Sequence, residues 1–348
     1  MTARPPTMIS AARLQAFAQA LLASAGLDEP GASLVAESLV WADLRGSPGH
    51  GVARIPQYAA WLESGDMNGR AQPRAGLSLP ALTVVEGDRC AGALGLRIAA
   101  GQAIAGARLA GASVVLLRET THTGALGFHT AHVAKAGMFA MAMAASAPLM
   151  AYHGASVAGV STAPLSMACP GPGEPIVFDM AAGAVAFGKL MQARVAGRPL
   201  EPGWAIDAMG NATTDARQAT TPLPLGGPKG SGLALMAEIA CSLLTNHPIL
   251  APALLDPAAV HRHTQNAWML VIDIAQVLDP SLFQAQLTEL AAAIHNLPAS
   301  AEGPPRLPGE RGYAEARERG KSGIALAPAT ADALEALASQ AGIRAPWA

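Results

Sequence analysis

Apolar residues recur at helical spacing near the start of the chain. In the stretch LQAFAQALLASAGL, Leu14, Phe17 and Leu21 are separated by polar or small residues, which predicts one apolar helix face. The stretch also imitates the apolar region and the ASA cleavage site of a signal peptide, but the regular spacing favours an amphipathic helix. A second helix is expected around GASLVAESLVWADLRG, ending near Gly46 and Pro48.

From about residue 80 the pattern changes to alternating strands and helices. Short apolar runs predict strands at ALTVVEG, SVVLLRE, FAMAMAAS, PLSMACP, PIVFDMA and AWMLVIDI. Helical patterns cover 95–110, 128–136, SGLALMAEIACSLL, 280–296, 309–320 and 328–341. We therefore predict a mixed α/β fold in two domains: a central sheet domain over residues 79–279, and a discontinuous helical domain built from residues 1–78 plus 280–348.

Composition narrows the possible partners. The 348 residues are 51% hydrophobic and 14% charged, with a net charge of -2 and no basic run, so neither nucleic acid nor an acidic membrane surface is an expected partner. No apolar run is long enough to span a bilayer. The cysteines are three and far apart, at positions 90, 169 and 241. This spacing argues against a disulfide framework or a zinc site and favours a reducing, cytoplasmic location.

The segment ADLRGSPGHGVARIPQY holds the first candidate for chemistry. His50 lies between Gly49 and Gly51, so the backbone can bend sharply and leave the imidazole open. If a helical turn follows, His50 and Arg54 share one face at i,i+4 spacing. A titratable imidazole beside a guanidinium suits acid–base work on a carboxylate. On spacing alone, a polar loop with a solvated Arg54 is an open alternative.

Two further segments follow predicted strands, where ligands of α/β sheets commonly bind. His122 stands in RETTHTGALGF, at the passage from a strand to a helix; a hydrogen-bonded loop histidine is the alternative. Asp179 ends the strand in FDMAAGAVAFGKL and precedes small residues, with Lys189 expected about three turns into the next helix. Asp179 could instead cap that helix.

The segment LPLGGPKGSGLALMAE places a glycine-rich turn and Lys229 at the start of a helix. Free amides, the helix dipole and an ammonium group favour phosphate there, although glycine could serve packing alone. The segment lacks Walker A spacing, and no GxGxxG follows the first strand, so a Rossmann site is not expected. The pair His261 and His263 has no further ligand at metal spacing, and no metal is expected.

Taken in order, these segments resemble those of the malate/L-lactate dehydrogenase family, NAD(P)-dependent oxidoreductases without a Rossmann fold. The resemblance runs from about residue 10 to about residue 340. It is carried by RGSPGHGVARIPQY, THTGALGF, STAPLSMACP, IVFDMAAGAVAFGKL, LPLGGPKGSGLAL and LPGERGYAEA. It implies NAD or NADP as cofactor, a small-molecule carboxylate as substrate and a homodimer, with substrate and dimer contacts in the helical domain and the cofactor on the sheet domain.

The resemblance also implies roles for individual residues. His50 corresponds to the catalytic histidine that exchanges a proton with the substrate, and Arg54 to the arginine that binds the substrate carboxylate. Thr162 corresponds to a threonine between substrate and nicotinamide, and His122 to a contact of both ligands. The remaining cofactor contacts implied are Thr123, Gly124, Ala125, Leu126, Asp179, Met180, Ala181, Lys229, Gly309 and Glu310.

Four positions depart from the family pattern by losing a polar side chain. They are Gly49, where serine is usual; Ala163, in STAP for GTNP; and Ala182 and Gly183, in DMAAG for DMATS. Losing these groups predicts a roomier, less polar site and a larger or more apolar substrate than malate or lactate.

We therefore expect reversible reduction of a 2-oxo acid to a 2-hydroxy acid by hydride transfer. One alternative is the reduction of a cyclic imine carboxylate such as piperideine-2-carboxylate. Lys189 counts against it, because the cyclic-imine reductases carry an acidic residue there. A second alternative is a catalytically weak relative that binds a dinucleotide without turning it over, which the four departures favour and the retained His50, Arg54 and His122 oppose.

Overall fold

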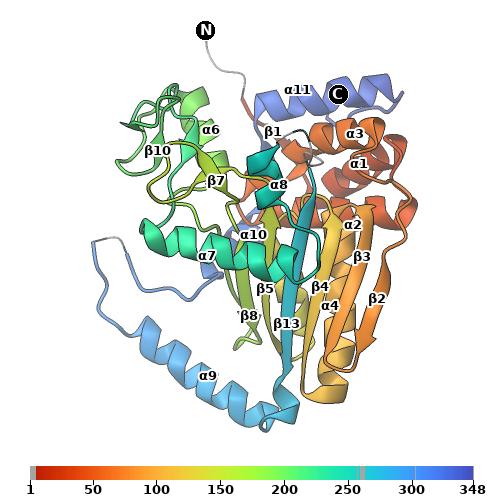
Figure 1. The fold of residues 1–348 in the computed structure, drawn as a ribbon, viewed down its shortest axis with the longest axis vertical. Helices are drawn as coiled ribbons and strands as arrows, with labels where there is room; N and C mark the ends of the chain where they lie inside the picture. The colour runs from red at the N-terminus through yellow and green to blue at the C-terminus, as the bar shows by residue number, and fades with distance from the viewer. Residues whose placement is uncertain (1–4, 257, 259–262, 302, 348) are drawn as a thin grey trace.

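Helices from both ends of the chain pack together at one end of a central sheet in the computed structural model, which describes residues 5–256, 258, 263–301 and 303–347 (Figure 1). One apolar cluster joins α1 (Ala11–Ser24), α2 (Glu29–Leu44), α3 (Ile55–Ser64) and α11 (Pro328–Gln340). Leu14, Phe17 and Leu21 are buried in it, which confirms the predicted amphipathic helix. The two ends also pair as antiparallel strands β1 (Thr7–Ile9) and β14 (Ile324–Leu326).

A seven-stranded sheet forms the middle of the molecule. Its strands in spatial order are β2 (Arg74–Leu79), β3 (Leu82–Cys90), β4 (Ala112–Thr120), β13 (Gln265–Asp273), β5 (Met138–Ser146), β8 (Leu165–Cys169) and β9 (Ile176–Met180). Within this sheet β3 and β4 are the parallel pair, joined by α4 (Gly92–Ala110), and the other neighbours are antiparallel. Because a Rossmann domain is built on a mostly parallel sheet, this topology confirms the expected non-Rossmann α/β fold.

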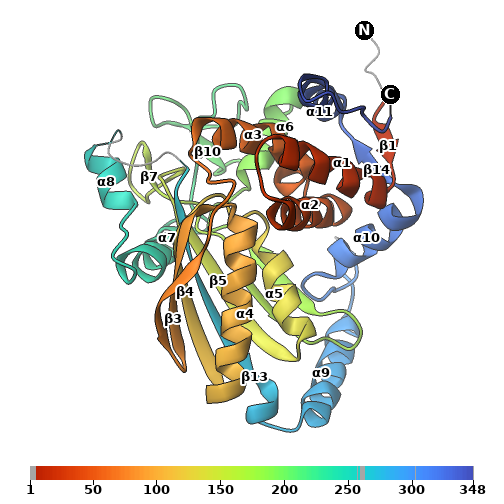
Figure 2. The same cartoon turned by 90° about the vertical axis from the view of Figure 1, so that its right-hand side faces the viewer.

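Helices cover both faces of this sheet (Figure 2). On one face, α4 and α5 (Leu126–Lys135) pack on a cluster that includes Leu117 of β4. On the other face, α7 (Pro228–Glu238) and the π-helical turn η3 (Ile239–Leu243) pack on Met143 of β5. The single helix predicted over SGLALMAEIACSLL is therefore an α-helix that ends in a wider π turn.

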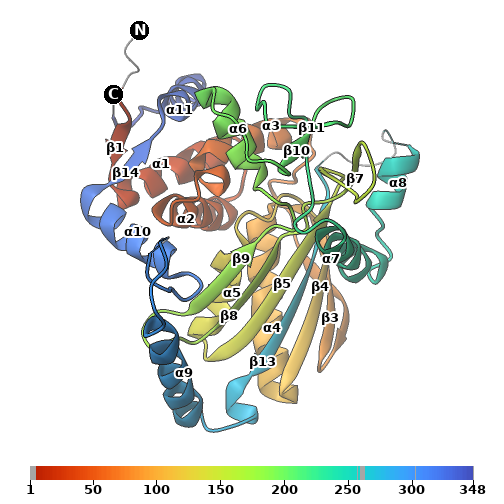
Figure 3. The ribbon, with the colours of Figure 1, turned by 90° about the vertical axis from the view of Figure 1, so that its left-hand side faces the viewer.

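Of a small unit beside the sheet, only the helix that carries Lys189 was predicted (Figure 3). The unit consists of α6 (Phe187–Ala196) and the short strands β10 (Ala205–Ile206), β11 (Ala212–Thr213) and β12 (Thr221–Pro222). Its own apolar cluster includes Leu190 and Leu200. β6 (Met150–Ala151) pairs with β7 (Ala158–Val160) and contacts β12 of this unit, and α8 (Leu250–Leu255) lies beside β7. Strands of two or three residues carry too little alternation to be predicted.

The C-terminal helices follow the predicted ranges. α9 (Pro280–His295) begins after Asp279, whose carboxylate accepts a hydrogen bond from the Ser281 amide at 2.7 Å. α9 lies below α7 and apart from it in Figure 1 and, within its span, buries Ala291 alone. α10 (Glu310–Ser322) returns to pack against α2. None of the described helices is long and apolar enough to cross a membrane.

Candidate active site

The segment between α2 and α3 carries His50 and Arg54 on two short 3-10 turns, η1 (Pro48–His50) and η2 (Val52–Arg54). The carboxylate of Asp43, on α2, accepts a hydrogen bond from the Val52 amide at 2.8 Å. A Cβ at Gly51 would lie 1.9 Å from Oδ1 of Asp43, so this close approach requires glycine. The predicted helical turn after His50 is thus a pair of 3-10 turns fixed on α2.

Four side chains from two segments meet at this place. The rings of His50 and His122 stack with centroids 5.8 Å apart and 8° between their planes. The Tyr58 hydroxyl and Nδ1 of His122 are hydrogen-bonded at 2.7 Å. Arg54 donates from Nε to the Gly49 carbonyl at 2.7 Å. The structure therefore brings His122 together with His50 and Arg54, although His122 lies far from the other two in the sequence.

Tyr58 is the member of this group that sequence reasoning missed. It lies on α3 and is buried. The signal was present, because Tyr58 follows Arg54 by four residues, the spacing already used to pair His50 with Arg54. The sequence could not show that Tyr58 pairs with His122, because His122 follows a strand in a distant segment and only the fold brings the two together.

Burial sets the charge state of this group. Burial, and then the positive charge of Arg54, lower the pKa of His50 to about 4. The same two causes, followed by His50, hold the pKa of His122 well below its usual range. Burial raises the pKa of the Tyr58 hydroxyl. At neutral pH two uncharged imidazoles and a phenol therefore surround one guanidinium, an arrangement suited to an anionic ligand that exchanges a proton.

The chain leads from His122 directly to the start of α5. Asp179, on β9, accepts a hydrogen bond from the Gly127 amide at 2.8 Å, so it caps α5. The alternative that Asp179 caps the helix that follows it is wrong, because α6 (Phe187–Ala196) begins at Phe187 with Ala186 before it and no side-chain cap. Burial raises the pKa of Asp179 to about 6, opposed by the Gly127 amide and by Arg45.

The expected place of Lys189 was wrong. α6 begins only at Phe187, so Lys189 lies in its first turn instead of three turns in. The backbone stays non-helical after β9 because Ala182 and Ala184 donate to the carbonyls of Thr162 and Leu223, both at 2.8 Å. These bonds come from distant segments and leave no local signal.

A buried arginine lies beside Asp179 at the edge of the sheet. Arg45 is sandwiched between the rings of Trp41 and Tyr313, at 4.6 and 3.9 Å from their centroids. Its Nη2 donates to the Gly309 carbonyl at 3.2 Å. Its buried Nη1 has no hydrogen-bond partner among the described residues. This nitrogen can still take an acceptor oxygen from a ligand.

Glu310, expected to contact the cofactor, is already engaged within the chain. Its carboxylate accepts from the Leu307 amide at 2.9 Å and pairs with His295 at 2.9 Å. Gly309 lies next to β9, where the Val177 amide donates to Pro308 at 3.2 Å. This expected contact region is thus tied to the strand that carries Asp179.

The predicted glycine turn lies at the N-terminus of α7. Gly226 and Gly227 take left-handed φ values of 57° and 61°, which glycine adopts at low cost. A Cβ at Gly230 would lie 2.5 Å from the Ala182 carbonyl, so α7 starts against the segment that follows β9. Lys229 is exposed at this start. The turn is linked to Thr162 by two backbone bonds: the Leu225 amide donates to the Ala182 carbonyl at 2.9 Å, and the Ala182 amide donates to the Thr162 carbonyl at 2.8 Å.

The four positions that depart from the family pattern differ in the space around them. Ala163 and Ala182 are fully buried in the apolar cluster under α7. A Cβ at Gly183 would lie 3.1 Å from the Val185 carbonyl, whereas one at Gly49 would meet nothing nearer than 4.0 Å. Of the four positions, two therefore hold buried methyl groups, and open space is found at Gly49 alone. Of the HRH pair, His261 lies outside the described residues and His263 stacks on Trp61 at 4.2 Å.

The chain as a whole is similar to known proteins of one family. The chain is 33% identical to ureidoglycolate dehydrogenase (NAD(+)) of Escherichia coli O157:H7 over 69% of each chain. It is 33% identical to (2R)-3-sulfolactate dehydrogenase (NADP(+)) of Chromohalobacter salexigens, covering 95% of this chain and 98% of the relative.

The fold is also similar to that of a solved structure. Delta1-piperideine-2-carboxylate reductase from Pseudomonas syringae pvar. tomato superposes with a TM-score of 0.84 at 29% identity, covering 95% of this chain and 99% of that one. A sequence model described as malate/L-lactate dehydrogenase matches residues 9–335. The chain therefore belongs to the malate/L-lactate dehydrogenase family of oxidoreductases.

Proposed function

We propose that the chain reversibly reduces a 2-oxo acid to a 2-hydroxy acid with NAD(P)H. The observation that carries this proposal is the stacked pair of neutral imidazoles beside Arg54. A planar guanidinium suits the carboxylate of the substrate. A neutral imidazole suits proton exchange with its oxygen. The group as a whole thus matches a small acid that gains or loses a proton.

His50 is the catalytic residue in this proposal. In oxidation, its neutral ring accepts the proton of the substrate hydroxyl at an imidazole nitrogen; in reduction, the protonated ring returns it. Arg54 fixes the carboxylate, helped by its own bond to the Gly49 carbonyl. His122, held by Tyr58, is assigned to contact both the substrate and the cofactor. Thr162 is assigned to the side between the two ligands.

The cofactor, NAD or NADP as in the named relatives, supplies or accepts the hydride. Its fit is supported by the free Nη1 of Arg45 and by the exposed Lys229 at a helix N-terminus. We assign to it the segment from His122 to Leu126, the residues Asp179, Met180 and Ala181, and the Lys229 and Gly309–Glu310 turns. Since the Glu310 carboxylate is engaged, its backbone is the part we assign to binding.

We further propose a substrate larger or more apolar than malate or lactate. Ala163 and Ala182, buried among apolar residues, stand where polar side chains are usual, so neither offers a hydroxyl or amide group that could select a substrate hydroxyl. Open space at Gly49 allows added bulk. A second candidate, a cyclic imine carboxylate, is favoured by the likeness to the piperideine-2-carboxylate reductase.

We also propose a cytoplasmic homodimer of two-domain subunits, divided as the sequence predicts. Three free cysteines fit a reducing compartment. Leu282 and Leu290 of α9 and Leu297 just beyond it are exposed, and so are Met236 and Leu244 of the α7–η3 stretch. Apolar surface of this kind commonly marks an interface. A second subunit on these helices would cover it.

The function is tested by following NADH and NADPH fluorescence with a panel of substrates. We expect oxidation of the reduced cofactor by 2-oxo acids, with longer or cyclic apolar side chains giving a higher kcat/KM than pyruvate or oxaloacetate. Turnover of piperideine-2-carboxylate alone would support the imine reductase instead. Fluorescence change on binding without oxidation by either class would show a dinucleotide-binding relative.

A further inference from the structure

The strand that delivers His122 to the site ends irregularly. Between the pairs Leu117–Ala267 and Thr120–Gln265, β4 has two residues and β13 has one, which defines a β-bulge. Glu119, in the bulge, takes a left-handed φ of 56°, uncommon for a residue other than glycine. The bulge turns the chain out of the sheet three residues before His122.

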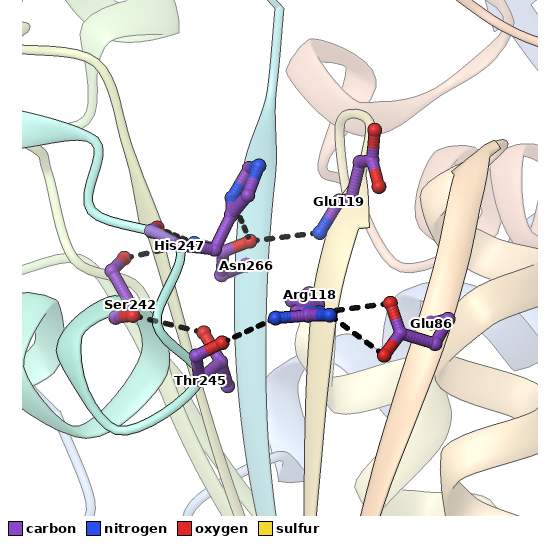
Figure 4. Close-up of polar contacts among 7 residues, drawn as sticks. All are labelled: Glu86, Arg118, Glu119, Ser242, Thr245, His247 and Asn266. Carbon is purple, nitrogen blue, oxygen red and sulfur yellow. Dashed lines mark hydrogen bonds and ion pairs between the residues drawn. The ribbon is translucent and has the colours of Figure 1, made fainter. Parts of the chain in front are cut away.

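The single residue opposite the bulge, Asn266, supports it from β13 (Figure 4). Its Oδ1 accepts a hydrogen bond from the Glu119 amide at 2.9 Å. Its Nδ2 donates to the Ser242 hydroxyl at 3.0 Å and to the His247 carbonyl at 2.8 Å. Asn266 is completely buried, so its carboxamide replaces the ladder bond that the bulge removes.

Asn266 is in turn fixed by a buried carboxylate. Ser242, in the π turn η3, donates to Oε2 of Glu238 at 2.8 Å. Oε1 of Glu238 accepts from the amides of Ile249 and Leu250, both at 2.9 Å. The π turn places Ser242 between Glu238 and Asn266, and π turns often occur at functional sites.

The residue next to Asn266 holds the other side of His122. Oε1 of Gln265 accepts from the Thr123 amide at 3.0 Å and from its hydroxyl at 3.1 Å. Two consecutive residues of β13 therefore bind the backbone on both sides of His122, at Glu119 and at Thr123.

We infer that Asn266 and Gln265 are positioning residues that set the place of the His122 ring in the active site. The inference rests on the proposed function for its effect on turnover, but its structural part stands on these bonds alone. Without Oδ1 of Asn266 the half-buried Glu119 amide is a donor lacking its acceptor, and the left-handed bulge relaxes. A shift of about 1 Å at a reacting group can lower turnover by about 10²-fold.

The neighbouring residue on β4 offers a matched control. Arg118 binds Glu86 on β3 through Nε and Nη2, at 2.9 and 2.8 Å, and donates from Nη1 to the Thr245 carbonyl at 2.7 Å (Figure 4). These bonds stabilise the same end of β4 but are directed to β3 and to the segment after η3. Loss of Glu86 should therefore weaken the strand without moving His122.

The test compares Asn266→Ala, Gln265→Ala and Glu86→Ala by ¹⁵N NMR of the histidine rings, with Tyr58→Phe identifying the His122 signal. We expect the His122 signal to move in the first two variants and to stay in Glu86→Ala, although Tm falls in all three. With a 2-oxo acid and NAD(P)H, kcat should fall about tenfold or more in the first two, with KM little changed.

Two outcomes would overturn the inference: an unmoved His122 signal in Asn266→Ala and Gln265→Ala, or an equal movement in Glu86→Ala. If Asn266→Ala fails to fold, the half-buried Gln265 still decides the question through its own variant. If the wild-type protein turns over no acid, the proposed function fails, and the NMR comparison still supports or rejects the positioning role.

Discussion

Together with burial, the positive charge of Arg54 lowers the pKa of His50, and in the free protein this favours one direction of the reaction over the other. The free protein keeps His50 neutral, because burial and Arg54 lower its pKa to about 4. A neutral ring is ready to act as the base for oxidation, whereas reduction needs its protonated form. A carboxylate bound at Arg54 would oppose the guanidinium charge and so make protonation of His50 easier.

The pH dependence of the two directions follows from this lowered pKa. Above the pKa of His50 its protonated fraction falls tenfold per pH unit, so kcat/KM for reduction should fall with rising pH between 6 and 8. For oxidation, kcat/KM should stay level in that range and decline only as pH falls toward 4. Initial rates in both directions measure this, and a level profile for reduction would contradict it.

Replacing His50 tests its role directly. His50→Ala should lower kcat by about 10²-fold or more, the usual effect of losing a general acid–base. Cofactor Kd, measured by fluorescence, should hardly change, because the residues assigned to the dinucleotide are others. Near-normal turnover in the variant would exclude His50 from the mechanism and shift attention to His122.

Asp43 links the catalytic segment to α2 and should make stability depend on pH. Burial raises its pKa to about 7 in the folded protein, against an ordinary 3.8. Between these pH values the folded state therefore holds a proton that the unfolded chain releases. The free energy of unfolding accordingly falls as pH rises from about 4 to 7.

Asp43→Asn retains an oxygen for the Val52 amide and removes the titration. Its free energy of unfolding should gain on the wild type as pH rises from 4 to 7, by an amount on the order of 2–4 kcal/mol. Thermal unfolding of both proteins across this range gives the difference. A difference that stays constant with pH would show that Asp43 does not titrate there.

Among the helices, α7 connects the two ends of the site. Its N-terminus presents Lys229, and its C-terminal end holds Glu238, at the start of the bonds that lead to Asn266. The first end is assigned to the cofactor and the second to the support of His122. A rigid α7 would therefore keep the bound cofactor in a fixed position relative to His122.

Lys229→Met tests the first of these ends. Loss of a charge-assisted contact to phosphate should raise the dinucleotide Kd about tenfold, and wild-type affinity should fall with added salt. Lys321→Met, at an exposed lysine in the last turn of α10, is the control and should bind normally. An affinity insensitive to salt and to Lys229→Met would mean that the glycine turn serves packing alone.

The same elements show how far the sequence could predict this protein. Helices such as α9 and α11, and strands such as β4 and β13, were predicted because their apolar period is long. The six residues of β2 are all exposed, so they show no alternation, and this strand was missed. The partners of Asp179 and Tyr58 could not be found, because Gly127 and His122 come from other segments and only the fold brings them together.

The assembled chain exposes apolar side chains on two outer helical stretches, and this predicts its oligomeric state. Leu290 of α9 is 57% exposed, and Leu244, directly after η3, is 66% exposed. Leu290→Asp and Leu244→Asp should each shift a dimer toward monomer, measured by light scattering over a range of concentrations. Leu109→Asp, at a residue 76% exposed on α4, should not. If all three variants keep the wild-type mass, these helices are not the interface.

The place of β13 in the sheet has a consequence for folding during synthesis. β13 lies between β4 and β5, two strands made much earlier. Until residue 273 has left the ribosome, both strands present unpaired edges, which readily join other chains. Long-range pairing of this kind is also slow. The nascent chain therefore has a long period in which aggregation competes with closure of the sheet. This period ends when β13, the strand that binds the backbone around His122, is synthesised.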